Sequence, residues 1–99
     1  MLQFPHLLQT YQENKYYYID SNATTQVVTG ACTLVRITVN TAAAGSIIII
    51  DGTAGGTANV GIIKASAAEG SYEYGIKMAS GIRIVTAHAD SDLTVVYRQ

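Results

Sequence analysis

The loop before the last predicted strand holds the residues best suited to metal chemistry. His88, Asp90 and Asp92 occupy alternate positions of the segment HADSD. Oxygen ligands at this spacing suit calcium, and an imidazole can add a transition-metal contact. The loop lacks the glycine and the distal glutamate of a calcium-binding helix–loop–helix, and aspartate before a strand is ordinary turn chemistry. We therefore interpret the segment as a turn and predict no metal and no cofactor.

A glycine-rich stretch, Gly52–Ala58 (GTAGGTA), raises the question of phosphate binding. A phosphate-binding loop continues into Gly-Lys-Ser/Thr and then a helix, and neither follows here. Glycine clusters between two apolar runs are typical of hairpin loops. The segment is therefore predicted to be a hairpin loop.

Catalytic arrangements are not indicated by the remaining residues. No serine lies in a Gly-x-Ser-x-Gly elbow, and Cys32, the single cysteine, has no evident partner and is expected to be a small buried hydrophobe. Glu69 and Glu73 suggest an acid–base pair, but the first falls in a turn and the second on an exposed strand face. Solvation explains both better. We predict that the protein is not an enzyme.

The segment Thr33–Asp51 (TLVRITVNTAAAGSIIIID) is the centre of the predicted fold. In its first part, side chains alternate: one face holds Val35, Ile37 and Val39, and the other holds Leu34, Arg36 and Thr38. This period of two indicates a half-buried strand, and the four isoleucines that follow suit a strand covered on both faces. Thr33–Asn40 and Ser46–Asp51 are therefore predicted to pair as an antiparallel hairpin.

Eight candidate strands follow one another at intervals of roughly ten residues. This rhythm predicts an all-β protein, an antiparallel β-sandwich, jelly-roll-like, with about eight short strands. Residues 15–99 form the sandwich domain and residues 1–14 an N-terminal arm. The expected core consists of aliphatic residues from the inward faces: Val35, Ile37, Val39, Ile47, Ile49, Ile62, Ile82, Ile84, Leu93 and Val95.

Charged residues make up only 13% of the 99-residue chain, about half the usual share. Six lysines and arginines are balanced by seven acidic residues. The cations are scattered singly, which argues against nucleic acid as a partner. No apolar run reaches the ~18 residues of a membrane span. A weakly charged, strand-rich surface leaves sheet edges poorly protected, so we expect the protein to work in an assembly.

Two neighbouring segments carry the residues expected at an interface. The arm is apolar at helical spacing, which suits docking on a neighbouring subunit or covering one end of its own sandwich. The strand KYYYID adds three successive tyrosines, which suit a protein interface or a sugar-binding platform. The predicted interface residues are Leu2, Phe4, Leu7, Leu8, Tyr11, Tyr16, Tyr17 and Tyr18.

The stretches LVRITVNTAAAGSIIIIDGTAGG and GSYEYGIKMASGIRIVTAHADSDLTVVYR carry a family resemblance. From about Thr33 to Arg98, the chain resembles small β-rich proteins of tailed-bacteriophage virions. Its marks are a strand ending Ile-Thr-Val-Asn, a Tyr-x-Tyr-Gly strand, a Gly-Ile-x-Ile-Val-Thr strand and a closing Leu-Thr-Val-x-Tyr-Arg. The N-terminal third carries no such resemblance.

The resemblance implies a structural virion protein, most simply a capsid cement (decoration) protein that bridges subunits on the outer capsid surface. Its partners would be the major capsid protein and copies of itself, with a trimer suggested by the three-fold sites of capsids. It would be made in the bacterial host cytoplasm and reside on the capsid exterior. A tail or fibre component, or a small carbohydrate-binding β-sandwich, is the alternative.

Overall fold

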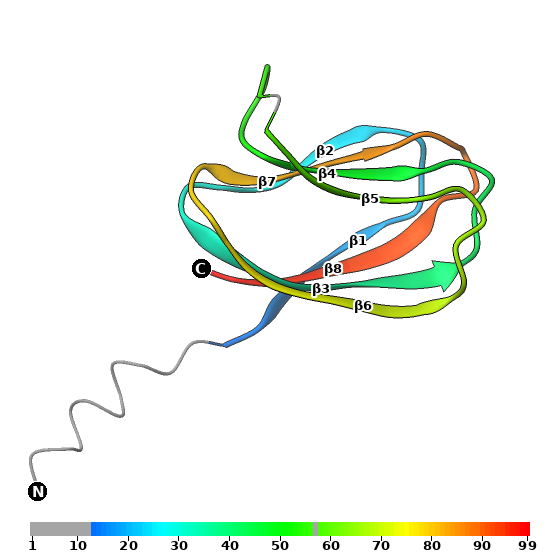
Figure 1. The fold of residues 1–99 in the computed structure, drawn as a ribbon, viewed down its shortest axis with the longest axis horizontal. Coiled ribbons are helices and arrows are strands. Elements are labelled where there is room, and N and C mark those ends of the chain that lie inside the picture. The colour runs from blue at the N-terminus through cyan, green and yellow to red at the C-terminus, as the bar shows by residue number, and fades with distance from the viewer. Residues whose placement is uncertain (1–12, 57) are drawn as a thin grey trace, which may run out of the picture.

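The computed structural model describes residues 13–56 and 58–99 as two packed antiparallel sheets (Figure 1). One sheet has the order β1-β8-β3-β6 and the other β2-β7-β4-β5. The strands are β1 (Lys15–Ile19), β2 (Thr24–Thr29), β3 (Cys32–Thr41), β4 (Ile47–Asp51), β5 (Asn59–Ile63), β6 (Gly70–Met78), β7 (Gly81–Thr86) and β8 (Asp92–Arg98). The prediction of an all-β antiparallel sandwich with eight strands is confirmed.

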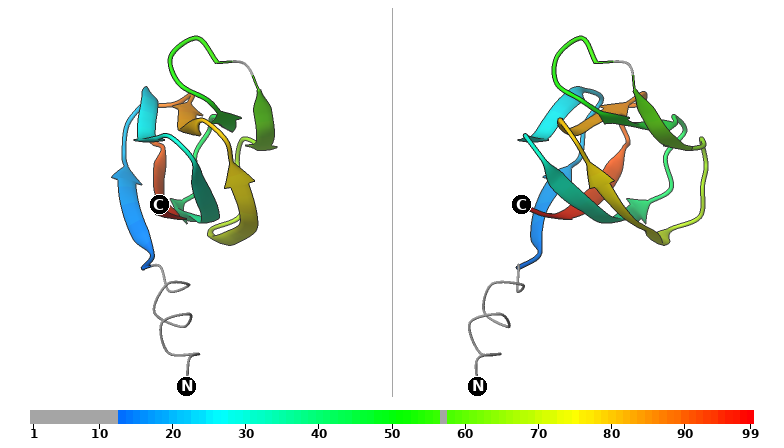
Figure 2. Two further views of the ribbon diagram at one scale, coloured as in Figure 1. Left: turned by 90° about the vertical axis from the view of Figure 1, so that its left-hand side faces the viewer. Right: turned by 60° about the vertical axis from the view of Figure 1, so that its left-hand side comes forward.

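The strands pair in a nested order. The first strand pairs with the last, β2 with β7, β3 with β6, and β4 with β5. The chain therefore passes from one sheet to the other at every connection except the one between β4 and β5 (Figure 2). That exception is the glycine-rich loop, which joins neighbouring antiparallel strands as predicted. The finer term jelly-roll-like stays a prediction for this path.

The predicted central hairpin is wrong. β3 and β4 lie in different sheets and do not pair with one another. β3 pairs with β6 and β8, and β4 with β5 and β7. The segment between them is thus a connection across the sandwich. Both strands bury their apolar faces against each other's sheet. This packing explains why both have the apolar sequence pattern expected of central strands.

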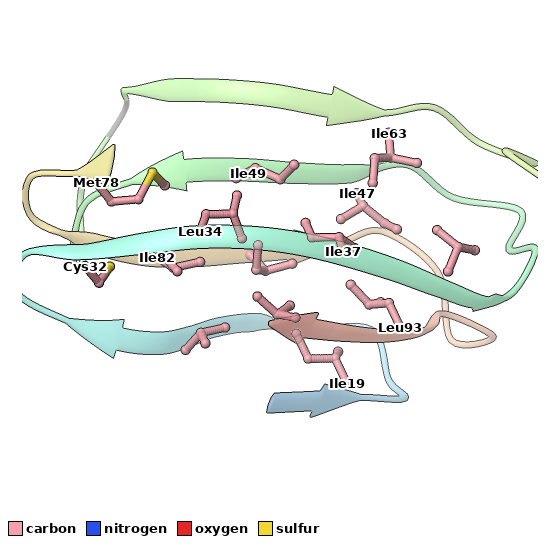
Figure 3. Packing of buried hydrophobic residues seen from close by; sticks show 14 residues of the cluster. Ile19, Cys32, Leu34, Ile37, Ile47, Ile49, Ile63, Met78, Ile82 and Leu93 are labelled. Carbon is pink, nitrogen blue, oxygen red and sulfur yellow. The ribbon is translucent and has the colours of Figure 1, made fainter. Parts of the chain in front are cut away.

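The core lies between the two sheets and is almost wholly aliphatic (Figure 3). Nine of the ten predicted core residues are buried. Several residues outside that prediction are buried with them: Ile19, Val27, Cys32, Leu34, Ile63 and Met78. Cys32 is therefore the buried hydrophobe that was expected. Burial raises the pKa of its thiol, and the nearby charge of Asp51 adds to the effect.

Leu34 points into the core, against the predicted alternation of β3. It is fully buried, and Val35 is buried without belonging to the core cluster. The ladders of β3 with β6 and with β8 both shift between Leu34 and Arg36. A β-bulge of this kind inserts a residue and reverses which face the following side chains occupy. Gly75, with φ of 62°, lies at the matching irregularity in β6.

Ile62 is the predicted core residue that is not buried. Its side chain is 55% exposed, whereas Ile63 is buried. The strand register explains why Ile63 is buried in place of Ile62, because Ile62 lies opposite Ile48 on the outer face and Ile63 lies opposite Ile47 on the inner face. A short strand with apolar residues on both faces does not reveal its inward side by alternation.

Asp51 links the two sheets at the end of β4. Its carboxylate accepts hydrogen bonds from the backbone N–H groups of Ala79 and Ser80, each at 2.9 Å. These residues form the turn between β6 in one sheet and β7 in the other. The bonds to Ala79 and Ser80, with a smaller contribution from Gly81, lower the pKa of Asp51 despite partial burial.

Candidate interaction surface

The three successive tyrosines lie on β1, which is an edge strand. β1 pairs with β8 on one side and has no neighbour on the other among the described strands. Tyr16, Tyr17 and Tyr18 are 74%, 42% and 49% exposed. Ile19 is buried and fixes the strand to the core. The predicted interface residues of this strand are therefore on the surface, which leaves their rings free to contact another molecule.

Tyr16 and Tyr18 share the outer face of their sheet. In the ladder with β8, Tyr16 lies opposite Val96 and Tyr18 opposite Thr94. Tyr17 has the parity of buried Ile19 and lies opposite buried Val95, but on this edge strand its side chain remains 42% exposed. Tyrosine rings that project from a short edge strand give contact area at low entropic cost.

A polar cluster adjoins Tyr18 on this face. Asn40 Nδ2 donates to Asp92 Oδ1 at 3.2 Å and to Thr94 Oγ1 at 3.1 Å, and Thr41 Oγ1 donates to Asp92 Oδ2 at 3.4 Å. The pKa of the Tyr18 phenol is raised, first by its hydrogen bond to Asp92, then by burial and nearby carboxylate charge. The cluster therefore fixes the ring beside hydroxyl, amide and carboxylate groups.

The rest of the outer face is also polar. Arg36 Nε lies 2.9 Å from Glu73 Oε2, and the hydroxyls of Thr38 and Ser71 are 3.0 Å apart. Both pairs bridge β3 and β6, and their register extends the rows that start at Tyr16 and Tyr18. The face thus runs from two aromatic rings at one edge to charged and hydroxyl groups at the other.

The three residues of the HADSD loop do not gather at one point. His88 Nδ1 pairs with Asp90 Oδ1, and the same Asp90 oxygen accepts from the backbone N–H of Ala44 at 3.3 Å. Asp92 belongs to the cluster beside Tyr18 instead. Among residues 13–56 and 58–99, no group of three or more potential metal ligands comes together. The contacts of His88 and Asp90 lie within the loop and reach the connection between β3 and β4 at Ala44.

Glu69 and Glu73 likewise have separate structural partners. Glu69 Oε2 accepts from the backbone N–H of Ala42 at 3.3 Å, and Glu73 pairs with Arg36. Each carboxylate therefore joins two segments of the chain.

The outer face of the second sheet carries an apolar row that the sequence analysis did not predict. Val85, Ile48 and Ile62 lie directly opposite one another across β7, β4 and β5. In the next row, Arg83 lies opposite Ile50 and its Nη1 donates to Gln26 Oε1 at 3.0 Å. Ile62 is the exposed end of the apolar row, at the sheet edge.

The other predicted interface residues, Leu2, Phe4, Leu7, Leu8 and Tyr11, lie outside the described residues. The structure begins with Glu13 and Asn14, next to the tyrosine strand. Asn14 Oδ1 accepts a hydrogen bond from Arg98 Nε at 2.7 Å. The point where the N-terminal segment joins the sandwich is thus held against β8.

No protein family, curated protein or solved structure matches this chain. In the described part of the chain, no helix has the length and apolar character needed to cross a membrane.

Proposed function

We propose that this chain is a structural protein of a tailed-bacteriophage virion, a capsid cement protein that binds the outer capsid surface. It bridges subunits of the major capsid protein and acts as a homo-oligomer, for which we expect a trimer. One observation carries the proposal most directly: three tyrosines are exposed together on an edge strand. Exposed aromatic rings are enriched at protein interfaces, and an unpaired strand edge offers backbone groups to a partner.

The low charge of the chain supports an assembled state. Lys15 and Asp20 are the charged residues that flank the tyrosines, and none lies between them. Edge strands of free monomers are commonly protected by charge, proline or bulges. A strand protected only at its ends suits a partner that covers it.

A sedimentation experiment with undecorated capsids tests the proposal. The double variant Tyr16→Ser/Tyr18→Ser should bind at least tenfold more weakly, because two exposed rings are lost from the interface. Ile62→Ser is the matched control, since it removes an exposed apolar side chain from the other sheet. Equal binding by the tyrosine variant and the control would refute a role for β1. A wild-type protein that never sediments with capsids would refute the cement function.

A carbohydrate-binding module is the second candidate, because the Tyr18 ring lies beside Asp92, Asn40 and Thr94. Aromatic rings next to amide and carboxylate groups match the apolar and hydroxyl faces of a sugar. A glycan array would distinguish the candidates. Binding of the wild type to glycans on the array, and loss of that binding in Asn40→Ala, would favour this second function. Capsid binding without glycan binding would favour the first.

A further inference from the structure

A row of three side chains at one end of the first sheet has the composition of an anion site. Thr33 on β3 lies directly opposite Lys77 on β6 and directly opposite Arg98 on β8. Side chains that face each other across strands have Cβ atoms about 5 Å apart. The two cations therefore flank one hydroxyl on the same outer face.

The row lines a cavity. A hollow of about 260 Å³ is bounded by Ala31, Cys32, Thr33, Lys77, Arg98 and Gln99. One water molecule occupies about 30 Å³ in the liquid, so the hollow can hold a tetrahedral anion with water around it. The strands of Lys77 and Arg98 are two ladder spacings apart, roughly 10 Å. Long side chains at that separation can close on an anion above Thr33.

Neither cation of this row forms an ion pair with a carboxylate of the described residues. The ion pairs within residues 13–56 and 58–99 are Arg36–Glu73 and His88–Asp90, so neither Lys77 nor Arg98 takes part in one. Glu73, the acidic residue on the same face of β6, is bound to Arg36. Asp51, whose charge reaches Cys32 at the cavity, is held by backbone N–H groups of the β6–β7 turn.

Arg98 is positioned by its own contacts. Its Nε donates to Asn14 Oδ1 at 2.7 Å, which leaves the terminal guanidinium nitrogens to other acceptors. The next residue is fixed as well, since Gln99 Nε2 donates to the backbone carbonyl of Thr29 at 2.7 Å. One side of the cavity is therefore anchored to both the start of β1 and the turn after β2.

We propose that Lys77, Thr33 and Arg98 form a binding site for a phosphate group, either free or as a monoester. Two cations match the double negative charge of phosphate, and a singly charged carboxylate satisfies the site less completely. The hydroxyl of Thr33 supplies a further donor between them. This proposal does not rest on the capsid function, because it is argued from the cations and the cavity of the Thr33 row and its ligand is a small anion.

The test is an amide chemical-shift titration of the isolated full chain with inorganic phosphate, at constant ionic strength set with sodium chloride. We expect saturable shifts centred on Thr33, Lys77 and Arg98. Glycerol phosphate in a parallel titration distinguishes a monoester site from a site for free phosphate, and acetate reports the weaker carboxylate. The proposal would be overturned if chloride caused the same amide chemical-shift changes as phosphate.

Matched lysine variants make the assignment specific. Lys77→Gln removes an exposed cation with no ion pair and should weaken phosphate binding about tenfold. Lys64→Gln removes another exposed lysine, which lies just after β5 of the other sheet, and should leave binding unchanged. Equal weakening in both variants would show only general charge attraction and would refute the site. Dispersed amide spectra of both variants confirm that they fold.

Discussion

Asp51 shows how one carboxylate can join two sheets. Its two short bonds to backbone N–H groups of the β6–β7 turn stabilise the ionised form, so its pKa is lowered in the folded protein. This stabilisation is fully present above the unfolded pKa of about 3.9 and is lost as the pH falls through the folded pKa. Stability should therefore decrease at acidic pH partly through this residue.

We expect Asp51→Asn to lower the free energy of unfolding at pH 7 by about 1 kcal/mol, because charge-assisted bonds become neutral ones. The difference from the wild type should shrink as the pH is lowered below 4. Urea melts across pH 3–7 measure both quantities. Asp20→Asn, at an exposed carboxylate beyond β1, is the control and should show little change. A difference that stays constant with pH would contradict this account of Asp51.

Two isoleucines test the position of the core. Ile37→Ala should cost about 2–5 kcal/mol, because its side chain is fully buried and truncation leaves a cavity. Ile62→Ala should cost less than about 0.5 kcal/mol, since Ile62 lies on the outer face. Denaturant melts of both variants give the comparison. Similar losses in the two would mean that the assigned inner face is wrong.

Strand alternation predicted most of the buried residues, and its failures have identifiable causes. Leu34 was assigned to the wrong face because a bulge changes the parity of β3, and a bulge leaves no mark in a period-two pattern. Ile62 was assigned to the core because its neighbour Ile63 is equally apolar. The polar cluster of Asp92, Asn40 and Thr94 joins segments from two strands, so no local spacing could reveal it.

At the level of elements, the turn into β7 depends on close backbone packing at Gly81. Its φ is 143°, and a Cβ there would lie 2.5 Å from the carbonyl oxygen of Val28. Gly70 begins β6 with a similar φ of 135°, but a Cβ at that position would meet no other atom within 4 Å. A comparison of substitutions at Gly81 and Gly70 therefore separates the cost of backbone strain, which both positions share, from the cost of steric conflict, which only Gly81 has.

We expect Gly81→Ala to be less stable than Gly70→Ala by about 1–3 kcal/mol, the usual cost of overpacking. The conflict is with backbone atoms, which cannot rotate away as a side chain can. Thermal and urea melts of both variants provide the measurement. If the two variants lose the same stability, strain at positive φ alone accounts for both glycines.

The pairing of elements was harder to predict than their existence. The eight strands were located to within a few residues because alternation and turn residues are local signals. The partner of each strand is not local: β3 and β4 follow one another but lie in opposite sheets. The small-residue segment Thr41–Gly45 suited a hairpin turn equally well, so sequence proximity favoured the wrong partner.

At the level of the whole molecule, the eight strands of the described residues span residues 15–98. A protein shortened to residues 13–99 should therefore unfold cooperatively with nearly unchanged urea dependence. If the N-terminal segment docks on a neighbouring subunit, which is one of its two predicted roles, the shortened protein should lose self-association and bind capsids more weakly. Light scattering and co-sedimentation measure these effects. Unchanged association and capsid binding would refute docking of residues 1–12 on a neighbouring subunit and favour the alternative role.

The nested strand order also has a consequence for the time course of folding. Lys15 at the start of β1 lies opposite Tyr97 near the end of β8, so β1 cannot pair with its partner until residues 92–98 have been synthesised. Such pairings close long loops before they gain contacts, which places folding in the millisecond-to-second range. On the ribosome, the tyrosine strand would remain unpaired until β8 has been synthesised. Only then would its exposed face be displayed on a finished sheet.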